Sequence, residues 1–354
     1  DQIADTAVHG RRNLIINGAV NVHQRNADNT ASDTFGPDRY RLQFSGGGTT
    51  MSQEDMTSSD TPYSSGFRNF LRIKNTTTAS GAGDYRQITY RLEAQDIANS
   101  GWDYTSTSAY MTVSFWVRSS VAGKFYFTLE TGGSGNDKYY GFSTTLVADT
   151  WKKVEHSVPG NSTLTFANST ARGLGFIVRG WLGTNFTDSG FTENTWGSFS
   201  LSSLAGDDLA NWAGTTNSTL DVVGLQMEVG SQATPFEHRS FADELHKCQR
   251  YYLSVKNVQT YAPVGVGRAW SGTRGNCAYY FPCEMRSNPT ISVANLSKFD
   301  IVPSGGNPTA IHNDGANLQS VKVGWVSSGV TSGNFYQFEF GNNTDGDLRF
   351  DSEL

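Results

Sequence analysis

Charged residues, cysteine and proline are all scarce in this chain. Its 354 residues include 3 cysteines, 9 prolines and 17% charged residues, with a formal net charge of −6. The lysines and arginines do not cluster, so we expect no nucleic-acid binding, because neutralising phosphates needs concentrated positive charge. No apolar run approaches the roughly 20 residues that a membrane-spanning helix needs, so we expect no membrane insertion.

The cysteines are Cys248, Cys277 and Cys283. Their odd number argues against a disulfide framework, and no Cys-x-x-Cys or histidine pair accompanies them as a zinc site would require. We expect buried free thiols that pack as small apolar groups, in a protein that folds in a reducing cytosol.

Glycine, with 38 residues, and aromatic residues, at 12%, are abundant. Such a composition favours short strands joined by many turns. The clearest strand pattern lies at 109–120, where Met111, Val113, Phe115 and Val117 alternate with polar residues. Roughly nine or ten such segments precede residue 237, which predicts an all-β fold, a sandwich with jelly-roll or Greek-key connections.

A strand, a turn and a short helix divide the chain. We expect an N-terminal linker or the end of a fibre stem at 1–11, a β-sandwich at 12–237, a linking helix at 238–256 and a smaller C-terminal β domain at 257–354. Ser240 is the expected N-cap of the helix, which we place from Phe241 to about Tyr252. Phe241, Leu245, Cys248 and Tyr252 follow one another at helical spacing. They form either a seam around the symmetry axis of an oligomer or a stripe that packs on the chain's own sandwich.

Several motifs resemble those of bacteriophage tail-fibre and other virion surface proteins. They are GRRNLIINGA from residue 10, DRY at Asp38–Tyr40, the run LQMEVGSQATPFEHRSFADELHKCQRYY that ends at Tyr252, and FPCEMRSNPTISV at Phe281–Val293. The opening NLI-x-NG and the strand DVVGLQMEVG also resemble jelly-roll carbohydrate-binding modules. Tyr40 stands where those virion proteins usually have tryptophan, and Val20 where they often have methionine.

The resemblance implies a virion structural protein, assembled in the host cytoplasm, with a jelly-roll domain of the carbohydrate-binding kind. It also implies a homotrimer that contacts other virion proteins. The function we expect is that of a tail fibre or similar appendage that adheres to host-surface polysaccharide. The alternatives are a capsid decoration protein and a glycan depolymerase.

Sugar binding needs flat apolar rings together with polar side chains. The long segment 180–199 offers Trp181, Phe186, Phe191 and Trp196 among polar residues, and Trp102 with Tyr104 forms a second candidate. The alternative is that these aromatic residues hold their loops onto the sandwich.

Asp221 lies where the resemblance places a calcium ligand, and calcium is the one cofactor we consider. The alternative is an ordinary edge carboxylate. We identify no catalytic residue, because a glycosidase needs two facing carboxylates and the sequence pairs none. We therefore expect a binding protein that is not an enzyme.

Overall fold

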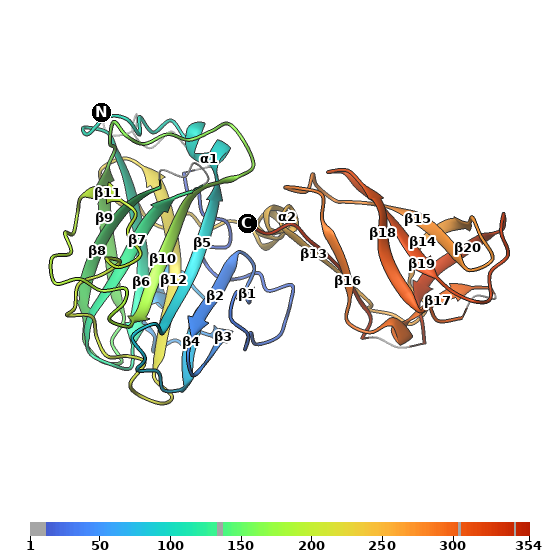
Figure 1. The fold of residues 1–354 in the computed structure, drawn as a ribbon, viewed down its shortest axis with the longest axis horizontal. Coiled ribbons are helices and arrows are strands. Elements are labelled where there is room, and N and C mark those ends of the chain that lie inside the picture. The colour runs from blue at the N-terminus through green and yellow to red at the C-terminus, as the bar shows by residue number, and fades with distance from the viewer. Residues whose placement is uncertain (1–11, 133–136, 304–305, 343–344) are drawn as a thin grey trace. The chain divides into compact units, whose positions relative to one another are not determined.

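The computed structural model describes residues 12–132, 137–303, 306–342 and 345–354. The expected linker at 1–11 lies outside them. The chain forms two compact units, one ending at Glu244 and including Leu354, the other spanning Leu245–Glu353. The fold is all-β: a jelly-roll β-sandwich, a short helix and a smaller C-terminal β region (Figure 1). None of the helices in the described ranges is long and apolar enough to cross a bilayer.

Two antiparallel sheets form the sandwich of the first unit. Within the described part of the chain, one sheet has seven strands in the order β1-β2-β5-β10-β7-β8-β11 and the other has five in the order β3-β4-β12-β6-β9. The strands of the larger sheet are β1 (Thr34–Phe35), β2 (Tyr40–Ser45), β5 (Tyr85–Glu93), β10 (Arg172–Leu182), β7 (Gly123–Thr131), β8 (Lys138–Leu146) and β11 (Trp196–Ser198). Those of the smaller sheet are β3 (Gly48–Asp55), β4 (Asn69–Thr77), β12 (Thr219–Val229), β6 (Tyr110–Ser119) and β9 (Lys152–Pro159).

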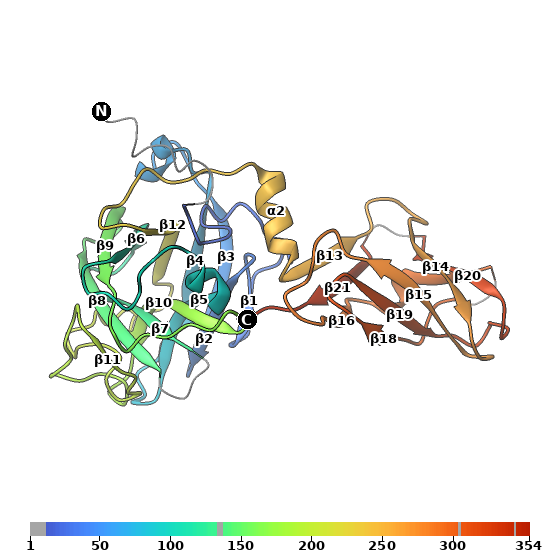
Figure 2. The ribbon, with the colours of Figure 1, turned by 90° about the horizontal axis from the view of Figure 1, so that it is seen from above.

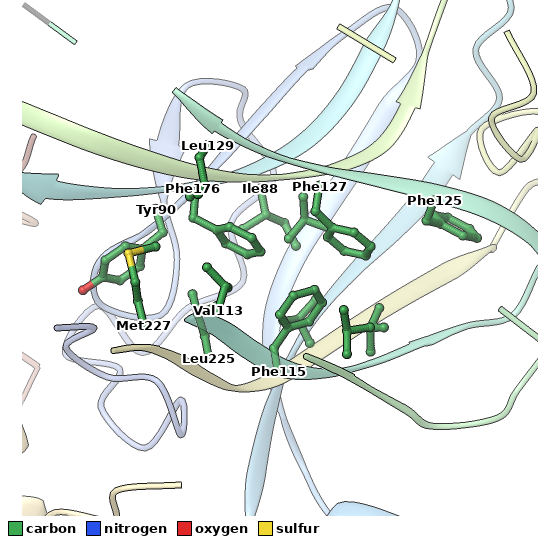
Figure 3. Close-up of a cluster of buried hydrophobic side chains, with 14 of the residues drawn as sticks. Ile88, Tyr90, Val113, Phe115, Phe125, Phe127, Leu129, Phe176, Leu225 and Met227 are labelled. Carbon is green, nitrogen blue, oxygen red and sulfur yellow. The ribbon is translucent and has the colours of Figure 1, made fainter. Parts of the chain in front are cut away.

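Alternating apolar residues of both sheets fill the space between them. On β6, the predicted set Met111, Val113, Phe115 and Val117 is buried, which confirms the pattern at 109–120. Figure 3 shows Phe115 from β6 facing rings from the other sheet, and its ring centroid lies 4.7 Å from that of Phe127. Since successive strand residues point to opposite faces, the intervening residues of each strand lie on the outer faces.

The second unit has its own hydrophobic core around Trp325, Phe338 and Phe350, all fully buried. Its described strands form a three-stranded sheet, β13-β21-β16, and a six-stranded sheet, β17-β20-β14-β15-β19-β18. Figure 2 shows β14, β15 and β19 side by side. The bounds are β13 (Tyr252–Lys256), β14 (Pro263–Ala269), β15 (Arg274–Tyr280), β16 (Thr290–Val293), β17 (Phe299–Val302), β18 (Ala310–Ala316), β19 (Ser320–Val326), β20 (Phe335–Phe340) and β21 (Asp347–Asp351).

Short helical segments complete the described structure: α1 (Ala94–Ala98), α2 (Phe241–Gln249), and the 3-10 turns η1 (Thr61–Ser65) and η2 (Leu296–Lys298). At the start of α2, the hydroxyl of Ser240 accepts a hydrogen bond from the backbone N–H of Asp243, at 3.2 Å, as a capping residue does.

The expected helix is too long, and its four-residue stripe is divided between two elements. The helix ends at Gln249, so Tyr252 belongs to strand β13. Phe241 is 59% exposed, whereas Glu244 is buried and accepts a hydrogen bond from the backbone N–H of Asn17. This polar contact determines which side of the first helical turn faces inward. Leu245 is half-buried and Cys248 is buried, so burial within the chain differs along the stripe, and the oligomer seam stays a prediction.

Candidate functional site

A row of polar side chains crosses the outer face of the seven-stranded sheet. On β5, Ile88, Tyr90 and Leu92 face the core, which places Gln87, Thr89 and Arg91 on the opposite face. Strand register then sets Gln43 of β2 and Arg179 of β10 directly beside Gln87 on either side. The row therefore arises from residues distant in sequence.

Hydrogen bonds connect this row across three strands. The guanidinium of Arg179 donates to the amide oxygen of Gln87. Gln87 Nε2 then donates to Gln43 Oε1 at 3.0 Å, and Thr89 Oγ1 donates to the same oxygen at 2.7 Å. Gln43 Nε2 in turn donates to Asp33 Oδ1 at 2.9 Å. Such mutual contacts fix the direction of each amide, so the polar groups are ordered before any ligand arrives.

Glu130 of β7 holds two arginines at one end of the row. Its Oε2 lies 3.0 Å from Arg172 Nη2, and its Oε1 accepts from Arg179, whose side chain is only 3% exposed. Both carboxylate oxygens are therefore engaged by guanidinium groups. Paired charges of this kind tolerate burial, whereas a lone charge does not.

The long connection from β10 to β12, residues 183–218, covers the neighbouring part of the same sheet face. Phe186 and Phe191 from this connection pack with Tyr126 and Tyr139 of β7 and β8. Tyr126 donates a hydrogen bond to Asp208 Oδ1 at 2.5 Å, and burial together with this bond raises the pKa of Tyr126 to about 12. The hydrogen bonds from Tyr126 and Lys124 hold the pKa of Asp208 below its usual range. Asp208 is therefore charged at neutral pH, and its bonds to Tyr126 and Lys124 attach the connection to β7.

The uncovered part of the face forms a pocket of about 380 Å³. Its floor is the polar row, and its wall is apolar, with Phe199 at 40% and Leu201 at 59% exposure. The lining residues are Gln43, Tyr85, Gln87, Thr89, Arg91, Glu130, Arg172, Ile177, Arg179, Leu182, Phe186, Phe199, Leu201 and Leu204. An apolar wall with a few ordered polar groups is the usual composition of a small-ligand site.

Of the six predicted sugar-binding residues, Phe186 lines this pocket. Its ring packs edge-to-face on Tyr85, with centroids 5.8 Å apart, and its carbonyl accepts a hydrogen bond from Leu204 N–H at 2.8 Å. Trp181 is half-buried and lines a different hollow, together with Thr184 and Asp207. The ring of Phe191 packs against Gly141 of β8, and a Cβ added at Gly141 would lie 2.4 Å from Cζ of Phe191.

Trp196 and Trp102 are buried in structural positions, which corrects their assignment as sugar contacts, whereas the assignment of Tyr104 stays a prediction. Trp196 is 9% exposed and its Nε1 donates to the carbonyl of Pro159 at 2.7 Å. Trp102 is 4% exposed, and the ring of Tyr104 packs perpendicular to that of Phe166, with centroids 5.0 Å apart. Trp102 and Trp196 are therefore too buried to offer a ring face to a sugar, whereas Tyr104 is half-buried.

Asp221 is an ion-pair centre, which corrects its assignment as a calcium ligand. Its Oδ1 lies 2.8 Å from Arg72 Nε, and its Oδ2 lies 2.8 Å from Arg118 Nη2. The hydrogen bond to Asp221 raises the pKa of Arg72. Two guanidinium groups repel a cation, so the residues around Asp221 do not fit calcium, and no metal-binding group of three His, Cys, Asp or Glu occurs within the described ranges.

A hollow of about 550 Å³ lies on the opposite, outer face of the smaller sheet. Phe67, Trp116 and Phe236 give it a mostly aromatic lining, with Lys153 and His238 at its edge. It lacks an ordered row of amides and guanidinium groups like that of the first pocket, so the first pocket is the better candidate.

The polar residues of the first pocket did not emerge as candidates from the sequence. The stretch QITYR at 87–91 carries a usable signal, because Ile88 and Tyr90 are apolar and core-facing while Gln87, Thr89 and Arg91 share the other face. Gln87 is 44 positions from its partner Gln43 and 92 from its partner Arg179, and Arg179 is 49 positions from Glu130, so only strand register brings these residues together.

No family model matches the sequence, and no curated protein matches it. Among solved structures, the enzymatically active domain of bacteriophage CBA120 tailspike protein 4 is similar at 8% identity and a TM-score of 0.35, over 62% of this chain and 21% of that one. This chain thus spans about a fifth of the length of that protein.

Two carbohydrate-binding domains are similar to a comparable degree. The xylan-binding domain from Paenibacillus barcinonensis has 11% identity and a TM-score of 0.28, over 59% of this chain and 95% of its own. The N-terminal cellulose-binding domain of a Cellulomonas fimi β-1,4-glucanase has 11% identity and a TM-score of 0.29, over 58% and 99%. The β-sandwich assignment rests on the observed sheets, to which likenesses at these TM-scores add nothing.

Proposed function

We propose that this chain binds glycan through the pocket on its seven-stranded sheet, and that it serves as a bacteriophage tail fibre or similar virion appendage that adheres to host-surface polysaccharide. The observation that carries the proposal is the hydrogen-bonded row Arg179–Gln87–Gln43 beneath an exposed aromatic and aliphatic wall. The virion role is supported by the sequence motifs at 10–19 and 225–252 that resemble those of tail-fibre proteins.

The chemistry of the pocket suits a sugar ring. Amide and guanidinium groups donate and accept hydrogen bonds with adjacent hydroxyls, while an aromatic face packs on the apolar side of a pyranose. Gln43, Gln87 and Thr89 supply the first kind of contact, and Phe186 with Phe199 supplies the second. Because the polar groups are already ordered by one another, binding costs little side-chain entropy.

We propose binding without cleavage. Hydrolysis of a glycosidic bond generally requires two carboxyl groups on either side of the bond. Among the described residues that line the pocket, Glu130 is the one carboxylate, and arginines engage both of its oxygens. A depolymerase would need a second acid beside it.

We also propose that the protein acts as a homotrimer on the virion, in contact with other virion proteins. One shallow sugar site binds weakly, whereas several identical sites on one particle raise the apparent affinity by orders of magnitude. A capsid decoration protein would instead bind the capsid shell, and it would not need glycan affinity.

The test is a glycan array followed by titration of the best oligosaccharide with wild type, Gln87→Ala and Phe186→Ala. Each pocket variant should weaken binding about tenfold, as expected for the loss of one ordered hydrogen bond or one stacking ring. Gln259→Ala and Phe335→Ala remove the same groups from exposed positions in the second unit and should bind as wild type does. Loss of binding in these controls but not in the pocket variants would overturn the proposal.

A further inference from the structure

The pocket contains more positive than negative charge. Arg91, Arg172 and Arg179 line it together with the single carboxylate of Glu130, so three guanidinium groups face one anion. Glu130 forms ion pairs with Arg172 and Arg179. The side chains that line the pocket therefore carry two more positive charges than negative ones.

Arg91 is the guanidinium that Glu130 does not engage. Its hydrogen bond runs from Nη1 to the backbone oxygen of Leu354, at 3.0 Å, and no side-chain carboxylate of the described residues forms an ion pair with it. Burial, and then the nearby charges of Arg172 and Arg41, lower the pKa of Arg91 to about 10. The group stays charged at neutral pH, and an arriving anion would relieve this repulsion.

The backbone leaves room beside these groups. In the sheet register, Gly175 of β10 lies between Arg91 of β5 and Glu130 of β7. A Cβ at Gly175 would lie 3.3 Å from Arg172 Nη2, so the absence of a side chain keeps the space next to this guanidinium open. The Nε atoms of Arg91, Arg172 and Arg179 are also buried without a hydrogen-bond partner among the described residues.

We propose that the glycan bound in this pocket is acidic, a polysaccharide whose sugar units carry carboxylates, and that Arg91 with Arg172 binds one such carboxylate. This inference rests on the proposed glycan-binding function. A planar carboxylate matches the paired N–H groups of a guanidinium, which bind it through two parallel hydrogen bonds. The excess charge in the pocket provides the attraction, and Gly175 provides the space.

The experiment measures affinity for four acidic polymers, namely polygalacturonate, alginate, hyaluronan and polysialic acid, each beside its carboxyl-reduced neutral form. Wild type should bind at least one acidic polymer ten or more times tighter than its reduced form. Arg91→Gln should lower affinity for the acidic polymer at least tenfold more than affinity for its reduced form, so that the preference disappears. Arg268→Gln, which removes the same charge from an exposed position in the second unit, should keep the preference.

The outcomes separate the inference from the function beneath it. Equal binding of acidic and reduced polymers would overturn the acidic-ligand inference and leave glycan binding intact. Binding of dextran sulfate as tightly as the best acidic polymer, weakened equally by Arg91→Gln and Arg268→Gln, would reveal general attraction to polyanions and would also overturn it. No binding to any polymer of either series would overturn both proposals.

Discussion

Arg179 of β10 and Gln87 of β5 are direct partners across the two strands, and the guanidinium of Arg179 donates a hydrogen bond to the amide oxygen of Gln87. The same guanidinium pairs with Glu130 on its other side. One nearly buried side chain thus orders both the amide row and the acid of the pocket.

Replacing Arg179 should therefore destabilise the first unit. Arg179→Met keeps much of the side-chain volume but leaves Gln87 and Glu130 without their shared donor. Loss of one partner of a buried pair costs about 3 kcal/mol of unfolding free energy. Urea unfolding measures this, with Arg268→Met in the second unit as the control. An unchanged midpoint in Arg179→Met would show that the observed pairing contributes nothing to stability.

The aromatic residues should separate by role. Trp102→Ala creates a cavity in the core and should lower the unfolding free energy by about 3–5 kcal/mol. Phe186→Ala should change stability much less but weaken glycan binding. Thermal unfolding and glycan titration on the same samples test this. Selective loss of binding in a stably folded Trp102→Ala variant would restore Trp102 as a sugar contact.

Asp221→Asn should destabilise the smaller sheet strongly. The asparagine keeps the shape but removes the buried charge that pairs with Arg72 and Arg118, and Arg118 retains only its ion pair with Asp60, so the cost is about 3 kcal/mol. Asp55→Asn, at an exposed position of the same sheet, is the matched control. Calcium or a chelator should leave the melting temperature of wild type unchanged, and a calcium-dependent rise that Asp221→Asn abolishes would contradict the ion-pair account.

Stability should fall below about pH 6.5, the ordinary histidine value. The ring of His156 stacks on Phe142 with centroids 4.0 Å apart, and burial lowers the pKa of His156. The unfolded chain then binds this proton more readily, so the contribution of His156 is present above pH 6.5 and is lost as pH falls through its folded pKa.

His156→Phe keeps the stacking and should flatten the pH dependence, measured as unfolding free energy between pH 7.5 and 5. His246→Phe, at an exposed position of α2, is the control and should follow wild type. A wild-type pH profile retained in His156→Phe would assign the effect to other groups.

Alternation along single strands made much of the fold predictable. Phe115 and its neighbours on β6 are buried as expected, because a strand with one buried face must repeat every second residue. The helix end was missed because Tyr252 fits helical spacing equally well, and only pairing of β13 with β21 decides its state.

The pocket was less predictable, because its contacts depend on which strands become neighbours. Gln43 and Gln87 are 44 positions apart, and Arg179 and Gln87 are 92 apart. A single sequence shows that each of these residues is polar, but strand order determines which charges meet. Aromatic residues such as Trp196 match the composition of a sugar site, because burial within a loop cannot be read from composition.

The most direct measurement of the central claim is a backbone amide NMR titration of the isotope-labelled protein with the oligosaccharide that binds best on the array. The account predicts that the perturbed amides cluster in β2, β5 and β10 and in the segment from Phe186 to Leu204. Perturbations confined to the hollow lined by Phe67, Trp116 and Phe236, or to the second unit, would contradict the account if β2, β5 and β10 were unaffected.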